Sequence, residues 1–200
     1  MDSPAYACVY GLTQPLGFRA AGGTCGIKAS GKPDLMLLAA DAPCAAAAVF
    51  TTNQMTSAPV DIDRAHLKAS RGRVRAVVVN SGNANASTGK PGYRNAQAMC
   101  QQVAQTLGCK TQEVLVSSTG IIGRPLPMDK IRSGIDALAG QLTRSPEADR
   151  AAAAAIMTTD LVPKGAVRQA KIGGRTITLA GICKGSGMIA PNMATMLAFL

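Results

Sequence analysis

The sequence predicts a mixed α/β fold with at least five strands and four helices. Of its 200 residues, 47% are apolar, which is enough to bury a core and excludes a disordered chain. Short apolar runs also alternate with segments of helical periodicity, which is typical of this fold class. Aromatic residues make up only 3%, so we expect a core of Ala, Val, Ile, Leu and Met.

The first third of the chain predicts a glycine-rich segment that is not helical, then two strands and a helix. Four glycines in residues 17–28 favour positive φ angles or close backbone approach over a helix. Apolar runs at 34–40 and 45–51, separated by Asp-Ala-Pro-Cys, predict two strands joined by a short turn. Residues 59–69 predict a short helix. It contains His66, the only histidine, which we expect to face solvent rather than act as a base.

Two buried strands are each followed by a polar, glycine-rich loop. The apolar run at 75–79 precedes the loop at 80–89, and the run at 113–117 leads into the loop at 117–123. Sites in α/β folds form where strands end in such loops. Helical periodicity follows both loops, at residues 92–107 and 127–142.

The next segment predicts a helix and then a hairpin. Ser145-Pro-Glu is a typical helix start, and the helix is expected to run over residues 146–157. Its five consecutive alanines, 151–155, suggest close packing against a neighbouring element. Strands at 168–172 and 175–182 flank Gly-Gly, which predicts a β-hairpin with a primed turn.

The last eighteen residues, 183–200, contain the segment on which the predicted chemistry of the chain depends. A glycine-rich loop containing Lys184 runs into Pro-Asn, and the small Ala194 then precedes Thr195 and an apolar run. We interpret this as a loop that delivers one threonine to the start of a buried strand. Because the sequence ends within this apolar run, we expect it to be the front part of a longer protein.

The net charge of +10 does not indicate nucleic-acid binding. The basic residues are scattered, and the densest stretch, 68–75, has no aromatic side chains for base stacking. We expect no nucleic-acid partner, but a basic surface that suits anionic substrates. Residues 1–7 do not resemble a signal peptide, and no apolar span reaches eighteen residues. We therefore expect a cytoplasmic protein without a membrane partner.

The polar loops offer only hydroxyls, amides and glycines. Loops 80–89, 117–123 and 158–164 contain no paired carboxylates, no histidine and no cysteine beside a base, and the six cysteines lack zinc spacing. Lys184-Gly-Ser-Gly does not have the order of a phosphate-binding loop. If the bond before Thr195 is cut, however, its α-amino group, with a pKa of about 7.7–8.0, can deprotonate its own hydroxyl. The alternative is a threonine that only opens a strand.

Several uncommon motifs follow one another in the order typical of one enzyme family. Residues 184–197, KGSGMIAPNMATML, are very similar to the cleavage-site signature of the ornithine acetyltransferase family, also called bifunctional glutamate N-acetyltransferase. Further blocks that resemble this family lie at 47–53, 78–86, 118–123 and 156–160, so the resemblance covers nearly the whole chain. It implies an α/β fold with sheets stacked between helices, resembling the N-terminal-nucleophile hydrolases.

The resemblance implies an acyltransferase of arginine biosynthesis that cuts itself into an α and a β chain. The enzyme would move the acetyl group of N2-acetylornithine to glutamate through an acetyl-threonine intermediate. The implied residues are Ala194 and Thr195 at the cleavage site, Thr195 as nucleophile, Thr119 and Gly120 as oxyanion hole, and Thr158, Lys184 and Thr195 in substrate binding.

The family's organisation has further implications for this chain. Residues 1–194 would be the α-chain region, a single α/β domain, and residues 195–200 would begin the β-chain strand. The partner would be the chain's own β chain, in a heterotetramer of two α and two β chains. No cofactor or metal is implied, but acetyl-CoA is a second donor in bifunctional members. The compartment is the cytoplasm, or an organelle if the source is a eukaryote.

Two positions depart from the family pattern, and two other functions stay open. Ser87 replaces a frequent cysteine, and Leu161 replaces a frequent threonine. The first alternative function is an N-terminal-nucleophile-type aminopeptidase or amidase, which would release its product to water instead of transferring it. The second is a non-catalytic basic binding module, which would bind DNA or RNA in a salt-dependent way and would not cut itself.

Overall fold

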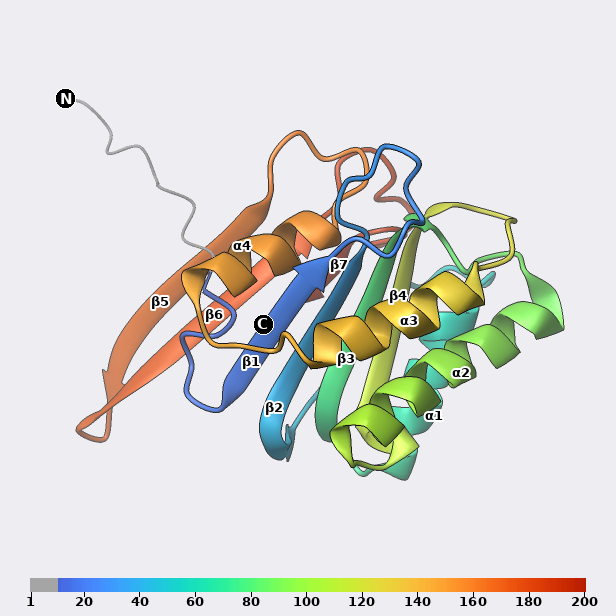
Figure 1. Ribbon diagram of the computed structural model, residues 1–200. Helices are drawn as coiled ribbons and strands as arrows, with labels where there is room; N and C mark the ends of the chain where they lie inside the picture. Colours follow the sequence, from blue (N-terminus) through green and yellow to red (C-terminus); the bar gives the residue numbers. More distant parts are fainter. Residues whose placement is uncertain (1–10) are drawn as a thin grey trace.

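Two β-sheets are stacked on each other, and helices cover the outer face of the larger sheet (Figure 1). This computed structural model describes residues 11–200. Residues 1–10, which include the segment expected not to be a signal peptide, lie outside the described residues. The prediction of an α/β fold with stacked sheets flanked by helices is confirmed.

The larger sheet has the strand order β1-β2-β3-β4. β1 pairs antiparallel with β2, β2 pairs antiparallel with β3, and β3 pairs parallel with β4. A parallel pair needs a crossover, which the second helix supplies between β3 and β4. The strands are β1 (Phe18–Gly23), β2 (Leu35–Ala45), β3 (Arg73–Asn83) and β4 (Val114–Ile121).

Three helices cover one face of this sheet and form the main core with it. Side chains from β2, β3 and β4, such as Leu37, Val78 and Val116, are fully buried against Met99 and Ile135 of the helices. The helices are α1 (Ala58–Ala69), α2 (Gly89–Leu107) and α3 (Met128–Ala139), and a short 3-10 turn, η1 (Thr111–Glu113), precedes β4. The expected apolar faces of α2 and α3 are thereby confirmed.

The opposite face of the larger sheet packs against α4 and the second sheet. The buried side chains Met36, Val79 and Ile182 join the two sheets in a second core cluster. Glycine is needed at Gly22 of β1, because an added Cβ would lie 2.3 Å from the backbone of Ala151. The close packing expected of the alanine run is thus confirmed. The elements are α4 (Pro146–Ala155), β5 (Lys164–Ile172), β6 (Arg175–Lys184) and β7 (Leu197–Phe199).

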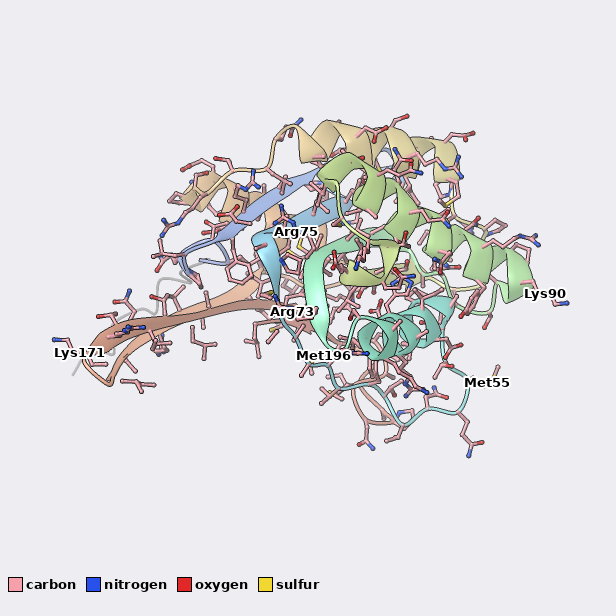
Figure 2. The ribbon with its side chains drawn as sticks, turned by 90° about the horizontal axis from the view of Figure 1, so that it is seen from below. Met55, Arg73, Arg75, Lys90, Lys171 and Met196 are labelled. Atoms are coloured by element: carbon pink, nitrogen blue, oxygen red, sulfur yellow. The ribbon has the colours of Figure 1, made fainter. Side chains whose placement is uncertain are left out.

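The second sheet has the order β5-β6-β7, and its hairpin projects from the body of the protein (Figure 1). Gly173 and Gly174 both have positive φ, at 58° and 76°, as a primed turn requires, so the predicted hairpin is confirmed. Lys171 lies at its tip, far from the helices (Figure 2).

Two predictions about the first half are wrong. The separate strand expected at residues 45–51 does not form: β2 instead runs as one strand to Ala45, with a register shift between Ala39 and Cys44, and residues 46–51 are in no strand. Such an irregularity accommodates Pro43, which lacks the N–H that a strand residue donates to the neighbouring strand. His66 is not exposed either. It is 5% accessible, and its Nδ1 lies 2.8 Å from the carbonyl oxygen of Val114.

Candidate active site

The polar segments of the sequence meet at one end of the larger sheet. The carboxyl ends of β3 and β4, the chain after α4 and the chain after β6 gather there, at the top of Figure 1. The strands run further into these segments than predicted, as far as Asn83 and Ile121. The parallel register therefore aligns Ser81 with Thr119 and Gly82 with Gly120.

Lys184 is the central side chain of this end of the sheet. It is the last residue of β6 and only 4% accessible, so its side chain does not face solvent. Its Nζ donates a hydrogen bond of 3.0 Å to Thr119 Oγ1 and lies 3.5 Å from the carbonyl oxygen of Thr195. Burial lowers the pKa of Lys184, while the nearby Asp160 carboxylate opposes that shift.

Thr119 and Gly120 sit at the end of β4, with different environments. Thr119 is buried and accepts the hydrogen bond from Lys184, so its own hydroxyl hydrogen is left to donate to another acceptor. Gly120 has φ 131°, and an added Cβ would lie 2.3 Å from the carbonyl carbon of Gly82. Only glycine fits there, because both the backbone conformation and the space exclude a side chain.

Asp160 is a site residue that the sequence analysis did not single out. Its Oδ1 accepts hydrogen bonds from the Lys164 ammonium (2.5 Å) and the Gly185 N–H (2.9 Å). Burial raises the pKa of Asp160, but these hydrogen bonds outweigh it and the pKa lies below its ordinary value. The carboxylate thus fixes the backbone beside Lys184. The only feature of the sequence that could have indicated Asp160 is its position as the single carboxylate in the loop at residues 158–164.

Thr158 lies beside this carboxylate at the end of α4. Its backbone N–H is 3.5 Å from Asp160 Oδ2, and the preceding carbonyl, of Met157, accepts a 2.8 Å hydrogen bond from Lys28 Nζ. The adjacent Thr159 hydroxyl lies 2.9 Å from the Ser186 hydroxyl. The structure therefore brings Thr158 close to the loop after β6, although no hydrogen bond joins its hydroxyl to Lys184.

The segment around Ala194 and Thr195 forms tight turns, not the start of a strand. β7 begins only at Leu197, and it is a half-buried edge strand. The N–H of Ala194 donates to the carbonyl of Ile189 at 3.2 Å, and the Thr195 hydroxyl donates to the carbonyl of Met188. Asn192 and Met193, directly before Ala194, have positive φ angles of 32° and 61°.

The part of the chain that the structure describes offers neither a metal site nor a membrane-spanning helix. Within residues 11–200, no group of three or more His, Cys, Asp and Glu side chains is placed to hold a metal ion. In the same range, each helix is too short or too polar to cross a bilayer. The site therefore consists of hydroxyls, backbone groups and one buried amine, with the Asp160 carboxylate holding the backbone beside that amine. Such groups suit attack of a hydroxyl on a carbonyl carbon.

Known proteins resemble the chain in both sequence and fold. It is 51% identical over 192 residues to the arginine biosynthesis bifunctional protein ArgJ of Symbiobacterium thermophilum, covering 95% of the chain and 47% of that protein. The corresponding protein of Gloeobacter violaceus is 52% identical over 190 residues, covering 95% and 46%. The chain thus spans about half the length of the curated relatives it matches.

Two solved structures match nearly the whole chain. The ArgJ crystal structure from Bacillus halodurans has a TM-score of 0.87 and 39% identity, covering 94% of both chains. Ornithine acetyltransferase from Mycobacterium tuberculosis, in complex with ornithine, has a TM-score of 0.83 and 40% identity, covering 94% of this chain and 97% of that one. The ArgJ family model matches residues 19–200. The chain therefore belongs to the ArgJ family.

Proposed function

We propose that the chain is the α-chain region of an ornithine acetyltransferase, or glutamate N-acetyltransferase, of arginine biosynthesis. The observation that supports this most is the position of the Lys184 amine, 3.0 Å from the Thr119 hydroxyl and 3.5 Å from the Thr195 carbonyl oxygen. It joins the proposed oxyanion hole to the proposed nucleophile. The names of the relatives support the same activity.

The first proposed reaction is self-cleavage between Ala194 and Thr195. Thr195 Oγ attacks the carbonyl carbon of Ala194, the C–N bond breaks, and the amide nitrogen takes the proton to become a free amine. Water then hydrolyses the resulting ester and leaves a carboxylate on Ala194. The relatives' lengths support a cut in this region, because the solved chains match over 94% and 97% of their own length, whereas the curated proteins are about twice as long.

The second proposed reaction is acetyl transfer by the freed Thr195. Its α-amino group, with an ordinary pKa of about 7.7–8.0, takes the proton of its hydroxyl, which attacks the acetyl carbon of N2-acetylornithine. Ornithine leaves with the proton on its amine. The amine of glutamate then attacks the acetyl ester and returns the proton to Thr195. Acetyl-CoA would enter as an alternative donor in the same first step, so no resident cofactor is needed.

Each of the remaining site residues has a role in this proposal. Thr119 donates its free hydroxyl hydrogen to the oxyanion, more strongly because Lys184 polarises it, and the Gly120 N–H is the second donor. Lys184 and Thr158 bind the substrate, the ammonium attracting a carboxylate. The chain's own β chain would complete the site, in a heterotetramer of two α and two β chains.

The proposal is tested with the full-length protein. We expect denaturing gels to show two pieces, with Thr195 at the N-terminus of the second by mass spectrometry. Thr195→Ala should stay whole and transfer no acetyl group, whereas Thr176→Ala, in the exposed hairpin, should behave as wild type. An uncut wild-type protein, or transfer by the Thr195→Ala variant, would contradict the proposal. Release of acetate without transfer would indicate the hydrolase alternative.

A further inference from the structure

The loop between β2 and α1, residues 46–57, contacts the segment directly before the proposed cleavage site. The Thr51 hydroxyl donates a 3.0 Å hydrogen bond to the carbonyl of Pro191, and the Asn192 side-chain amide donates a 2.9 Å hydrogen bond to the Thr52 hydroxyl. The partners are 140 residues apart in sequence. In Figure 2, the loop that contains Met55 lies on the same side of the molecule as Met196.

The loop is itself anchored to α1, so it can act as a fixed support. The Arg64 guanidinium lies over the Phe50 ring at 5.1 Å, and its Nη2 is 3.5 Å from the Thr51 carbonyl oxygen. The Thr56 hydroxyl donates to Asp61 at 2.8 Å. A support of this kind can hold a neighbouring segment in a conformation that it would not adopt alone.

The supported segment is held in such a conformation. Asn192 and Met193 have positive φ angles, which are uncommon for residues with a side chain; asparagine tolerates them better, so the conformation is least favourable at Met193. Strained backbone persists only where the surroundings determine it, and it is common at functional sites. Here the strained pair is followed at once by Ala194, whose carbonyl carbon is the proposed target of Thr195.

We propose that Thr51 and Thr52 are positioning residues for self-cleavage and not for acetyl transfer. This inference rests on the proposed function. Before the cut, the two hydroxyls hold Pro191 and Asn192 and so fix where the Ala194 carbonyl lies relative to Thr195. After the cut, residues 191–194 belong to a free chain end and Thr195 to the other piece. The hydrogen bonds then no longer constrain the nucleophile.

The test compares the rate of cleavage with the rate of transfer in the full-length protein. Loss of both hydrogen bonds in Thr51→Ala/Thr52→Ala should slow cleavage on the order of 10–100-fold, followed on gels during cell-free synthesis. Thr51→Ser/Thr52→Ser keeps both hydroxyls and should restore most of the rate. The cleaved fraction of the Ala variant should transfer acetyl with kcat and KM within about twofold of wild type.

A second variant separates this effect from misfolding. Asn192→Ala removes the donor to Thr52 from the other side and should also slow cleavage while leaving the melting temperature unchanged. Cleavage of the double Ala variant at the wild-type rate would overturn the inference, as would a raised KM of its cleaved fraction. Failure of the wild type to cut at all would instead overturn the proposed function.

Discussion

Asp63 allows a sharp test of how the fold depends on pH. It lies on α1, is 8% accessible, and its Oδ1 accepts a 2.8 Å hydrogen bond from the N–H of Val116 in β4. Burial raises the pKa of Asp63 to about 8, although the hydrogen bond from Val116 opposes the shift. The folded state holds the proton of Asp63 more tightly than the unfolded state does. The contribution of this carboxyl to stability is therefore greatest in acid and is lost as the pH rises from about 4 to 8.

Asp63→Asn should remove this loss. The amide is neutral at every pH, and its oxygen can still accept the hydrogen bond from Val116. With 1.36 kcal/mol per pKa unit, the variant should gain roughly 4 kcal/mol in unfolding free energy over the wild type between pH 5 and pH 9, as an upper limit. Water penetration would reduce this to roughly half.

The assay is urea unfolding of the full-length protein at pH 5, 7 and 9. Asp129→Asn, which removes an exposed carboxylate of α3, serves as the matched control and should leave the pH dependence of the wild type in place. If Asp63→Asn unfolds with the same pH dependence as the wild type, the carboxyl is already ionised in the folded state and the reasoning is wrong.

Two further predictions concern the site. Gly120→Ala should abolish acetyl transfer and lower the melting temperature, because the new Cβ would lie 2.3 Å from the backbone of Gly82. Gly140→Ala, where a Cβ has room, should do neither. Normal transfer by Gly120→Ala would contradict the role of the Gly120 N–H as an oxyanion donor. Lys184→Met should lower kcat/KM by about 100-fold, whereas Lys171→Met at the hairpin tip should leave kcat/KM unchanged. Equal kcat/KM values for the two variants would show that Lys184 has no role in the reaction.

Local patterns predicted much of the fold. Ile131 and Ile135 recur at helical spacing and both are fully buried on α3, and the Gly-Gly pair between two apolar runs forms the expected turn. The misplaced elements depended on contacts distant in sequence. His66 has polar neighbours along the chain, but α1 packs against β4, and the His66 Nδ1 lies 2.8 Å from the carbonyl oxygen of Val114 in that strand.

Sequence motifs suggested candidate site residues, but they gave no information on the geometry of the site. Motifs named Lys184, Thr119 and Thr195, yet no sequence pattern states that residues 65 positions apart, Lys184 and Thr119, share a hydrogen bond. The burial of Lys184 follows from the stacking of the second sheet on the first, which periodicity cannot indicate. Asp160 was missed for the same reason, since its partners Lys164 and Gly185 come together only in the fold.

The two proposed reactions place different demands on one hydroxyl. In both, Thr195 Oγ attacks a carbonyl carbon, and Thr119 is placed by Lys184 to receive the oxyanion. Before the cut, the nitrogen of Thr195 is an amide and cannot act as a base, so the attack depends more on a target carbonyl already held in position. After the cut, the free α-amino group supplies the base. The proposal therefore requires the strained turn at residues 192–193 only once, and requires Lys184 and Thr119 in every catalytic cycle.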